Sequence, residues 1–106
     1  MAIRELGKTI PDRQIDRLKE GIKEELRRPE KKAHRSGAPV IFRERTGVKK
    51  YSHYYVVWDK FKGLGQEIRS SIVYNSIKDE LGQAEALKTT VAMGLTHSQA
   101  QEMGLI

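Results

Sequence analysis

The chain has 106 residues, of which 38% are hydrophobic and 32% are charged, and its formal net charge at pH 7 is +6. A chain of this length forms one domain of ordinary size with a single modest core. It contains no cysteine, which excludes disulfides, a thiolate nucleophile and cysteine-based zinc or iron–sulfur sites. We therefore expect one cytoplasmic domain over residues 1–106, in a reducing compartment.

Membrane and secretion signals are not evident in the sequence. The longest apolar run without charge, Tyr51 to Trp58, is far too short to cross a bilayer. The first residues, Met1 to Glu5, have no apolar signal core. We expect no membrane partner and no secretory peptide.

The charge is unevenly distributed along the chain. Residues 1–50 carry 15 Lys and Arg against 8 Asp and Glu, whereas residues 51–106 carry 5 against 6. A basic cluster of this kind can meet nucleic acid or an acidic protein. The alternative is a solvated linker followed by an outward strand face, which needs no partner.

A first helix is predicted over residues 10–28, after an N-terminal tail at residues 1–9. Thr9 is placed to cap this helix, and Pro11 fits its first turn without loss of a hydrogen bond. Gly21 lies in the middle, where glycine costs about 1 kcal/mol relative to alanine, so the helix depends on packing. Its apolar stripe comprises Ile15, Leu18, Ile22 and Leu26.

A linker and a β-hairpin are predicted next. Residues 29–39 contain two prolines, one glycine and several charges, which indicates an exposed basic linker. Residues 40–58 form the hairpin, with strands at 40–45 and 51–58 joined by a turn in which Gly47 takes a positive φ. The second strand is apolar on both faces, which favours a central or well-covered position.

The second half of the chain begins with a helix predicted over residues 66–81, which Gly82 ends. Its apolar stripe comprises Leu64, Ile68, Ile72, Val73, Ile77 and Leu81. Residues 84–93 are ambiguous, because their beginning is typical of a helix and their end of a strand. We favour a third strand at 87–93. A capping box at Thr96 then opens a short helix over 96–103.

No catalytic or metal-binding constellation is evident in the sequence. The three histidines are His34, His53 and His97, and none has a second histidine or a carboxylate at ligand spacing. Ser70-Ser71 lacks the context of a nucleophile elbow, and Gly63-Leu64-Gly65 lacks the residues of a phosphate loop. We expect no enzyme activity, no metal and no cofactor; a site centred on His53 is the weaker alternative.

The hairpin carries the residues best suited to binding. Arg43 and Arg45 share one strand face, Lys49 and Lys50 lie at the tip, and Tyr51 and Tyr54 are close by. Cations that hold phosphates beside rings on which bases stack are typical of a single-strand or RNA surface. The alternative is an ordinary solvated strand, where Arg, Lys and Tyr are common.

The middle of the chain resembles the BolA family, a small α+β fold related to the second class of KH domains. The resemblance covers about residues 53–99, beginning with a serine-histidine-aromatic strand that runs into an aspartate and a Phe-x-Gly turn, Ser52 to Gly63. Arg69 matches the start of the family's Arg-His-Arg. The other matching segments are Ile72-Val73-Tyr74, Asp79-Glu80-Leu81, Ala86-Leu87 and Leu95-Thr96.

This resemblance implies a binding or adaptor role. Members of the family hold an iron–sulfur cluster together with a monothiol glutaredoxin, through a histidine that is Glu85 in this chain. The family's helix histidine and second arginine are Ser70 and Ser71 here. A carboxylate is a poor substitute for histidine on a soft iron–sulfur centre, so the fold is expected to carry over without the cluster. The Gly-x-x-Gly clamp of KH domains on RNA is also absent.

The sequence thus predicts an α+β domain in the order α-β-β-α-β-α, with a two- or three-stranded sheet covered on one face by helices 10–28 and 66–81. The leading hypothesis is a non-catalytic, BolA-like adaptor with a protein partner. The alternative is a nucleic-acid-binding module, and an exposed strand edge would also allow a homo-oligomer. The predicted binding surface comprises Arg43, Arg45, Lys49, Lys50, Tyr51, His53 and Arg69.

Overall fold

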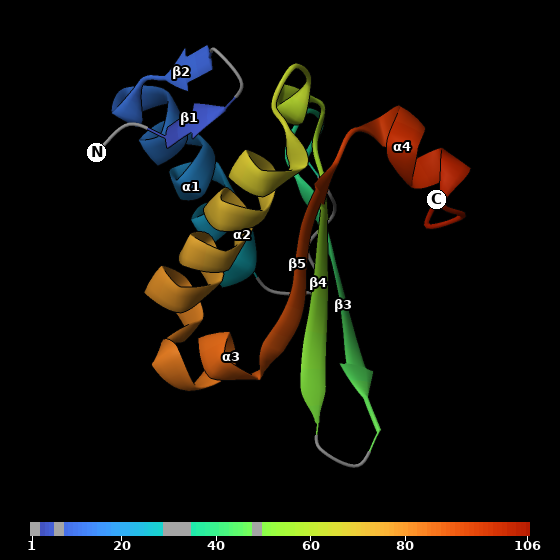
Figure 1. Cartoon of the computed structure of the whole chain (residues 1–106). Coiled ribbons are helices and arrows are strands. Elements are labelled where there is room, and N and C mark those ends of the chain that lie inside the picture. The colour runs from blue at the N-terminus through green and yellow to red at the C-terminus, as the bar shows by residue number, and fades with distance from the viewer. Residues whose placement is uncertain (1–2, 6–7, 29–34, 48–49) are drawn as a thin grey trace.

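A computed structural model describes residues 3–5, 8–28, 35–47 and 50–106. It shows the predicted α+β order, with two long helices standing against one side of a three-stranded sheet (Figure 1). A pair of short strands comes first, β1 (Ile3–Glu5) and β2 (Lys8–Ile10). The remaining elements are α1 (Asp12–Arg27), β3 (Val40–Thr46), β4 (Tyr51–Val57), the 3-10 turn η1 (Asp59–Phe61), α2 (Gln66–Leu81), α3 (Gln83–Lys88), β5 (Thr89–Leu95) and α4 (His97–Glu102).

The main sheet has the strand order β3-β4-β5. Strands β3 and β4 form the predicted antiparallel hairpin, in which Arg43 lies opposite Tyr54. Strand β5 runs parallel to β4, because the chain crosses over through η1, α2 and α3 between them. The prediction that the second strand of the hairpin is central is confirmed.

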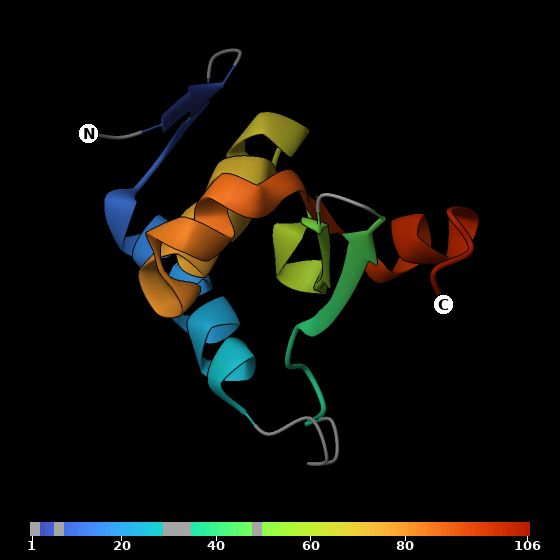
Figure 2. The same cartoon turned by 90° about the horizontal axis from the view of Figure 1, so that it is seen from below.

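The core lies between this sheet and the two long helices. Figure 2, which looks at the molecule from below, shows α1 and α2 side by side on one side of the hairpin and α4 on the other. Gly21 is where α1 comes closest to Trp58, since a Cβ built there would lie 2.5 Å from the Trp58 ring. The glycine that weakens the helix is therefore required by packing. The buried core comprises Ile10, Leu18, Ile22, Tyr54, Val56, Trp58, Phe61, Ile68, Ile72, Val73 and Ile77.

The N-terminal prediction was wrong in two respects. Within residues 1–9, which were expected to be a tail, the described residues belong to an antiparallel strand pair, with Ile3 opposite Ile10. Thr9 lies in β2 and does not cap the helix, because α1 begins at Asp12 after Pro11. Ile10 is buried in the core, and this burial ties β2 to α1.

The linker prediction holds only in part. Residues 29–34 lie outside the described residues, and Arg35 is exposed as expected. Pro39, however, is buried, and the Gly37 carbonyl accepts a hydrogen bond of 2.9 Å from the indole N–H of Trp58. The end of this segment is therefore packed against the start of η1.

The ambiguous segment at residues 84–93 contains both predicted structures in succession. Gly82, with a φ of 96°, turns α2 into α3, and the third strand follows at 89–95 rather than at 87–93. Leu87, expected on a strand face, consequently lies on α3 and is 70% exposed. Leu81 is 40% exposed and does not belong to the core stripe.

The predicted capping box before α4 is confirmed. The Gln99 N–H donates to Thr96 Oγ1 at 3.3 Å, and the Thr96 N–H donates to Gln99 Oε1 at 3.0 Å. Among the described residues, no helix has the length and apolar character needed to cross a membrane.

Candidate functional site

The hairpin divides the predicted binding residues between two faces. Its lower end extends past α3 (Figure 1). Arg43 and Arg45 lie opposite Tyr54 and Ser52, on the inner face that α1 and α2 cover further along the sheet. Glu44 lies opposite His53 on the outer face. The expected pairing of the two arginines on one face is thus present.

The partly buried carboxylate of Glu85, on α3, holds the inner face of the hairpin against that helix. Glu85 Oε2 accepts hydrogen bonds from the Tyr54 hydroxyl at 2.5 Å and from the Ser52 hydroxyl at 3.0 Å. Arg45 donates to Ser52 Oγ at 3.3 Å, and its guanidinium lies 3.7 Å from Glu85 Oε1. Arg45 is therefore engaged within the protein.

The protonation of this carboxylate network follows from its contacts. Burial alone raises the pKa of Glu85, but hydrogen bonds from Tyr54 and Ser52, together with the charges of Arg45 and Arg43, outweigh burial and leave the pKa below its ordinary value. Burial, and then the hydrogen bond to Glu85, raise the pKa of Tyr54 to about 12. At neutral pH a phenol thus donates to a charged carboxylate.

The aromatic residues expected beside the cations are not available there. Tyr54 is 2% exposed and its hydroxyl is held by Glu85. Tyr51 lies opposite Thr46, on the outer face. Lys50 is exposed at the tip, and Lys49 lies outside the described residues. On the described hairpin, the arginines and the exposed tyrosine face opposite sides.

Arg69 is a structural residue rather than part of a surface. It is 6% exposed, and its guanidinium donates to the Leu64 carbonyl at 2.7 Å, to the Gly94 carbonyl at 3.3 Å and to Gln99 Oε1 at 2.6 Å. These contacts join α2, β5 and α4. Its place in the predicted binding surface is therefore wrong.

The outer face of the sheet is the surface that the sequence did not single out. Its end nearest α4 is covered, in a cluster of Val57, Leu95 and Ala100. Away from α4, the described helices leave the face uncovered (Figure 1). We call this uncovered part, together with Thr46 and Tyr51 at the hairpin tip, the outer face; its other residues are Phe42, Glu44, His53, Tyr55, Val91 and Met93.

Half-buried apolar side chains dominate the outer face. Phe42, Tyr55 and Met93 pack at the margin of the α4 cluster. His53 Nδ1 lies 3.2 Å from Glu44 Oε1. The strand register places this polar pair nearer the hairpin turn than Phe42 and Tyr55. The signal in the sequence was the run of β4 that is apolar on both faces.

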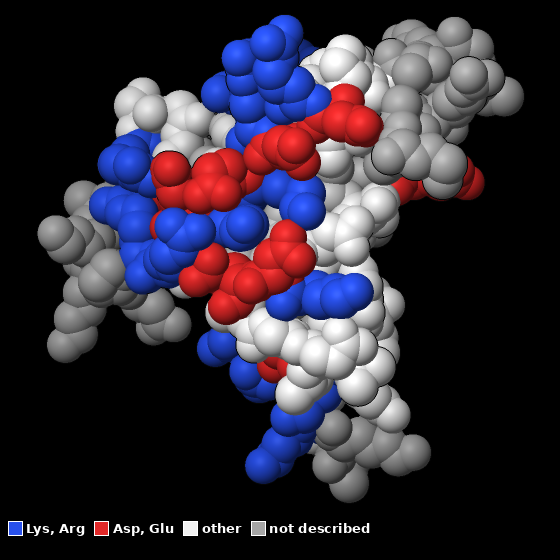
Figure 3. Space-filling view, turned by 90° about the vertical axis from the view of Figure 1, so that its left-hand side faces the viewer, with Lys and Arg blue, Asp and Glu red and all other residues white. Residues whose placement is uncertain are grey.

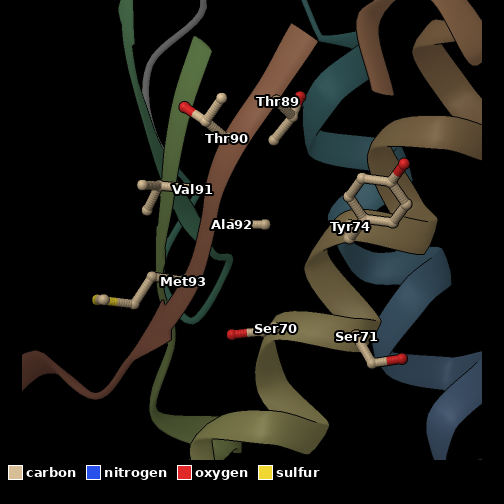
Figure 4. A pocket seen from close by; sticks show the side chains of 8 residues that line it. All are labelled: Ser70, Ser71, Tyr74, Thr89, Thr90, Val91, Ala92 and Met93. Atoms are coloured by element: carbon tan, nitrogen blue, oxygen red, sulfur yellow. The ribbon is translucent and has the colours of Figure 1, made fainter. Parts of the chain in front are cut away.

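A groove separates α2 from the free edge of β5. Figure 4 shows the small Ala92 side chain pointing across this groove toward Tyr74 on the helix. The lining is uncharged and rich in hydroxyl groups. It comprises Ser70, Ser71, Tyr74, Thr89, Thr90, Val91, Ala92 and Met93.

The charges on α1 are balanced, with five Lys and Arg against five Asp and Glu over residues 12–27. Figure 3 shows Lys and Arg interleaved with Asp and Glu over the helical side of the molecule. Lys19 lies 2.9 Å from Asp79, and Arg27 lies 2.7 Å from Glu80, which joins α1 to α2. The charged side of α1 is therefore a network of ion pairs with α2 and does not account for the basic excess of residues 1–50.

The described part of the chain contains no cluster of three or more His, Asp or Glu placed to hold a metal ion. His34 lies outside the described residues. His53 pairs with Glu44, whereas the backbone N–H of His97 donates to Asp59 at the start of α4.

Comparisons with protein-family models, with curated proteins and with solved structures found no match for this chain. The residues and geometry of the chain itself therefore carry the functional inference.

Proposed function

We propose that the chain is a non-catalytic, BolA-like adaptor that acts through protein contacts in the cytoplasm. The observation that carries this proposal is the outer face, an apolar sheet surface left uncovered by the described helices. The α-β-β-α-β-α order agrees with the fold that the resemblance implies. The absence of cysteine from the sequence supports the proposed compartment.

The chemistry of the outer face favours a protein partner. Phe42, Tyr55 and Met93 present aromatic and thioether groups, which are enriched at protein interfaces, and methionine adapts its shape to a partner. The polar pair of Glu44 and His53 lies at its margin, as polar groups do at an interface rim. The carboxylate of Glu44 would repel a phosphate backbone.

The adaptor role is proposed without an iron–sulfur cluster. Glu85 occupies the position of the BolA family's cluster histidine, and its carboxylate already accepts two hydrogen bonds and faces Arg45. A hard oxygen ligand engaged in this way is unsuited to a soft metal centre.

The test compares two outer-face variants, Tyr55→Lys and Met93→Lys, with a matched control, Leu87→Lys, on exposed α3. Each tagged variant is expressed in cells, and its bound proteins are quantified after circular dichroism has verified folding. We expect the same partner with the wild type and Leu87→Lys, and its loss with both outer-face variants. Equal recovery with all variants, or no enrichment over empty beads, would contradict the proposal.

The alternative function is nucleic-acid binding by the basic hairpin. It is favoured by Arg43 and Lys50, which are both exposed on the hairpin. If phosphates bind there, affinity for single-stranded RNA falls steeply as salt rises, and Arg43→Ala together with Lys50→Ala reduces that slope by about 2. Binding that is absent or independent of salt would exclude this function.

A further inference from the structure

Strand β5 presents part of its backbone at an open edge of the described sheet. The Leu95 carbonyl accepts from the Trp58 N–H at 2.8 Å, so Leu95 turns its backbone toward β4. Gly94 turns the other way, where its N–H donates to Gln66 Oε1 and its carbonyl accepts from Arg69, both at 3.3 Å. Since direction alternates along a strand, Ala92 also turns its N–H and C=O to the open edge.

The groove beside this edge is lined by small side chains at one part and by a large one at another. Ser70, Ser71 and Ala92 are small, whereas Tyr74 projects from the next turn of α2 (Figure 4). A strand that added to β5 at Ala92 would lie along this groove. An open edge next to a groove is a template for strand pairing.

The helix that flanks the groove carries opposite charges at its two ends. Glu67 and Lys78 are both exposed, and with Ser71 and Tyr74 they recur at helical spacing on one side of α2. The chain directions of α2 and β5 are opposed, because the start of α2 contacts Gly94 near the end of β5. This face is therefore acidic beside the end of β5 and basic beside its beginning.

This pattern is complementary to itself under a two-fold rotation. In two antiparallel copies of α2 centred between residues 72 and 73, Glu67 meets Lys78 and Ser71 meets Tyr74. Ala92 lies across the groove from Ser71 and Tyr74, so the same axis would pass close to Ala92 of β5. A two-fold interface requires one patch that matches itself in this way.

We propose that this face binds a second copy of the chain. The two β5 strands pair antiparallel about Ala92, each Glu67 faces the second copy's Lys78, and each Tyr74 lies over the second copy's Ser71. The Gly94 backbone groups keep their partners on α2. The pairing joins the two sheets and extends the outer face through Val91 and Met93 of both copies. It goes beyond the proposed function and does not depend on it.

Charge reversal provides the sharpest test. Sedimentation equilibrium gives the dimer Kd of the wild type, of Glu67→Lys, of Lys78→Glu and of the double variant. Each single reversal turns two attractive pairs into repulsive ones and is expected to weaken the dimer about tenfold. The double variant restores both pairs and should recover the wild-type Kd. Glu102→Lys, on exposed α4, is the control and should leave the Kd unchanged.

Mixing the two single variants tests the antiparallel arrangement itself. Glu67→Lys has only cations at these positions and Lys78→Glu only anions, so the mixture should form a heterodimer more tightly than either variant pairs with itself. The amide exchange of Ala92 should slow as protein concentration rises. A protein that is monomeric at every concentration, or a dimer whose Kd is the same for all these variants, would overturn the proposal. The groove would then bind a different partner.

Discussion

The two faces of the main sheet are built from the same three strands but end in different environments. On the inner face, Tyr54 and Val56 are buried under helices, and the polar groups near them are held by Glu85 and Arg69. On the outer face, their neighbour Tyr55 remains half-buried. Alternation along one strand therefore separates a face that stabilises the fold from a face that is available to a partner.

The two phenylalanines of the chain give the largest expected difference between core and outer face. Phe61 is fully buried in the core, whereas Phe42 is half-buried on the outer face. Phe61→Ala should lower the free energy of unfolding by about 3–5 kcal/mol because it leaves a cavity. Phe42→Ala should cost less than half of that. Urea unfolding of both variants measures the difference, and equal losses would contradict the assignment of the two faces.

Close packing beneath the inner face predicts the next effect. A Cβ at Gly94 would lie 2.9 Å from both Arg69 Cβ and a Phe61 ring carbon. Gly94→Ala should therefore destabilise the protein by about 1–3 kcal/mol through overpacking, although alanine is the better residue in a strand. Thermal unfolding checks this, and a variant at least as stable as the wild type would show that α2 lies further from β5.

Adjacent tyrosines sharpen the comparison further. Tyr54→Phe removes the hydrogen bond to the partly buried Glu85 and should cost about 1–2 kcal/mol. Tyr55→Phe, one residue along on the other face, should change the free energy of unfolding by no more than about 0.5 kcal/mol. Chemical denaturation of the pair provides the measurement; the reverse order would mean that the strand faces are exchanged.

The pH dependence of stability at Glu85 is the smallest of the expected effects on the free energy of unfolding. Since the pKa of Glu85 is lowered in the folded protein, its stabilisation is present above the ordinary carboxyl pKa of 4.5 and is lost as pH falls through the lowered value. Glu85→Gln lacks this contribution. The gap in unfolding free energy between wild type and Glu85→Gln should therefore narrow as the solution is acidified from neutral pH. A constant gap would indicate that Glu85 has no lowered pKa.

Local patterns in the sequence were sufficient to predict most of the helices and strands. The helix at 66–81 and the capping box at Thr96 have the predicted positions, because helical spacing and end signals lie within a few residues. Residues 84–93 were harder, since a helix of six residues and a strand of seven are both too short to show a clear period. The sequence also showed no pattern for the pairing of β1 with β2, because each strand has only three residues.

The candidate site was harder to predict than the fold. The sequence placed Arg43 and Arg45 on one face correctly, but the acid that engages Arg45 lies 40 residues away at Glu85. Arg69 precedes the buried Ile72 and Val73 by three and four residues, and this helical spacing is the signal that it faces the core. Which side of β4 remains uncovered depends on where two distant helices pack, and local pattern does not contain that information.

Site-specific photocrosslinking tests directly whether the outer face binds another protein. A photoreactive amino acid replaces Met93 on the outer face in one sample and Leu87 on exposed α3 in another, and both proteins are irradiated in living cells. If the outer face binds a protein, position 93 should give a discrete protein adduct that position 87 does not give. Adducts of equal yield from both positions, or none from position 93, would contradict a binding surface on the outer face.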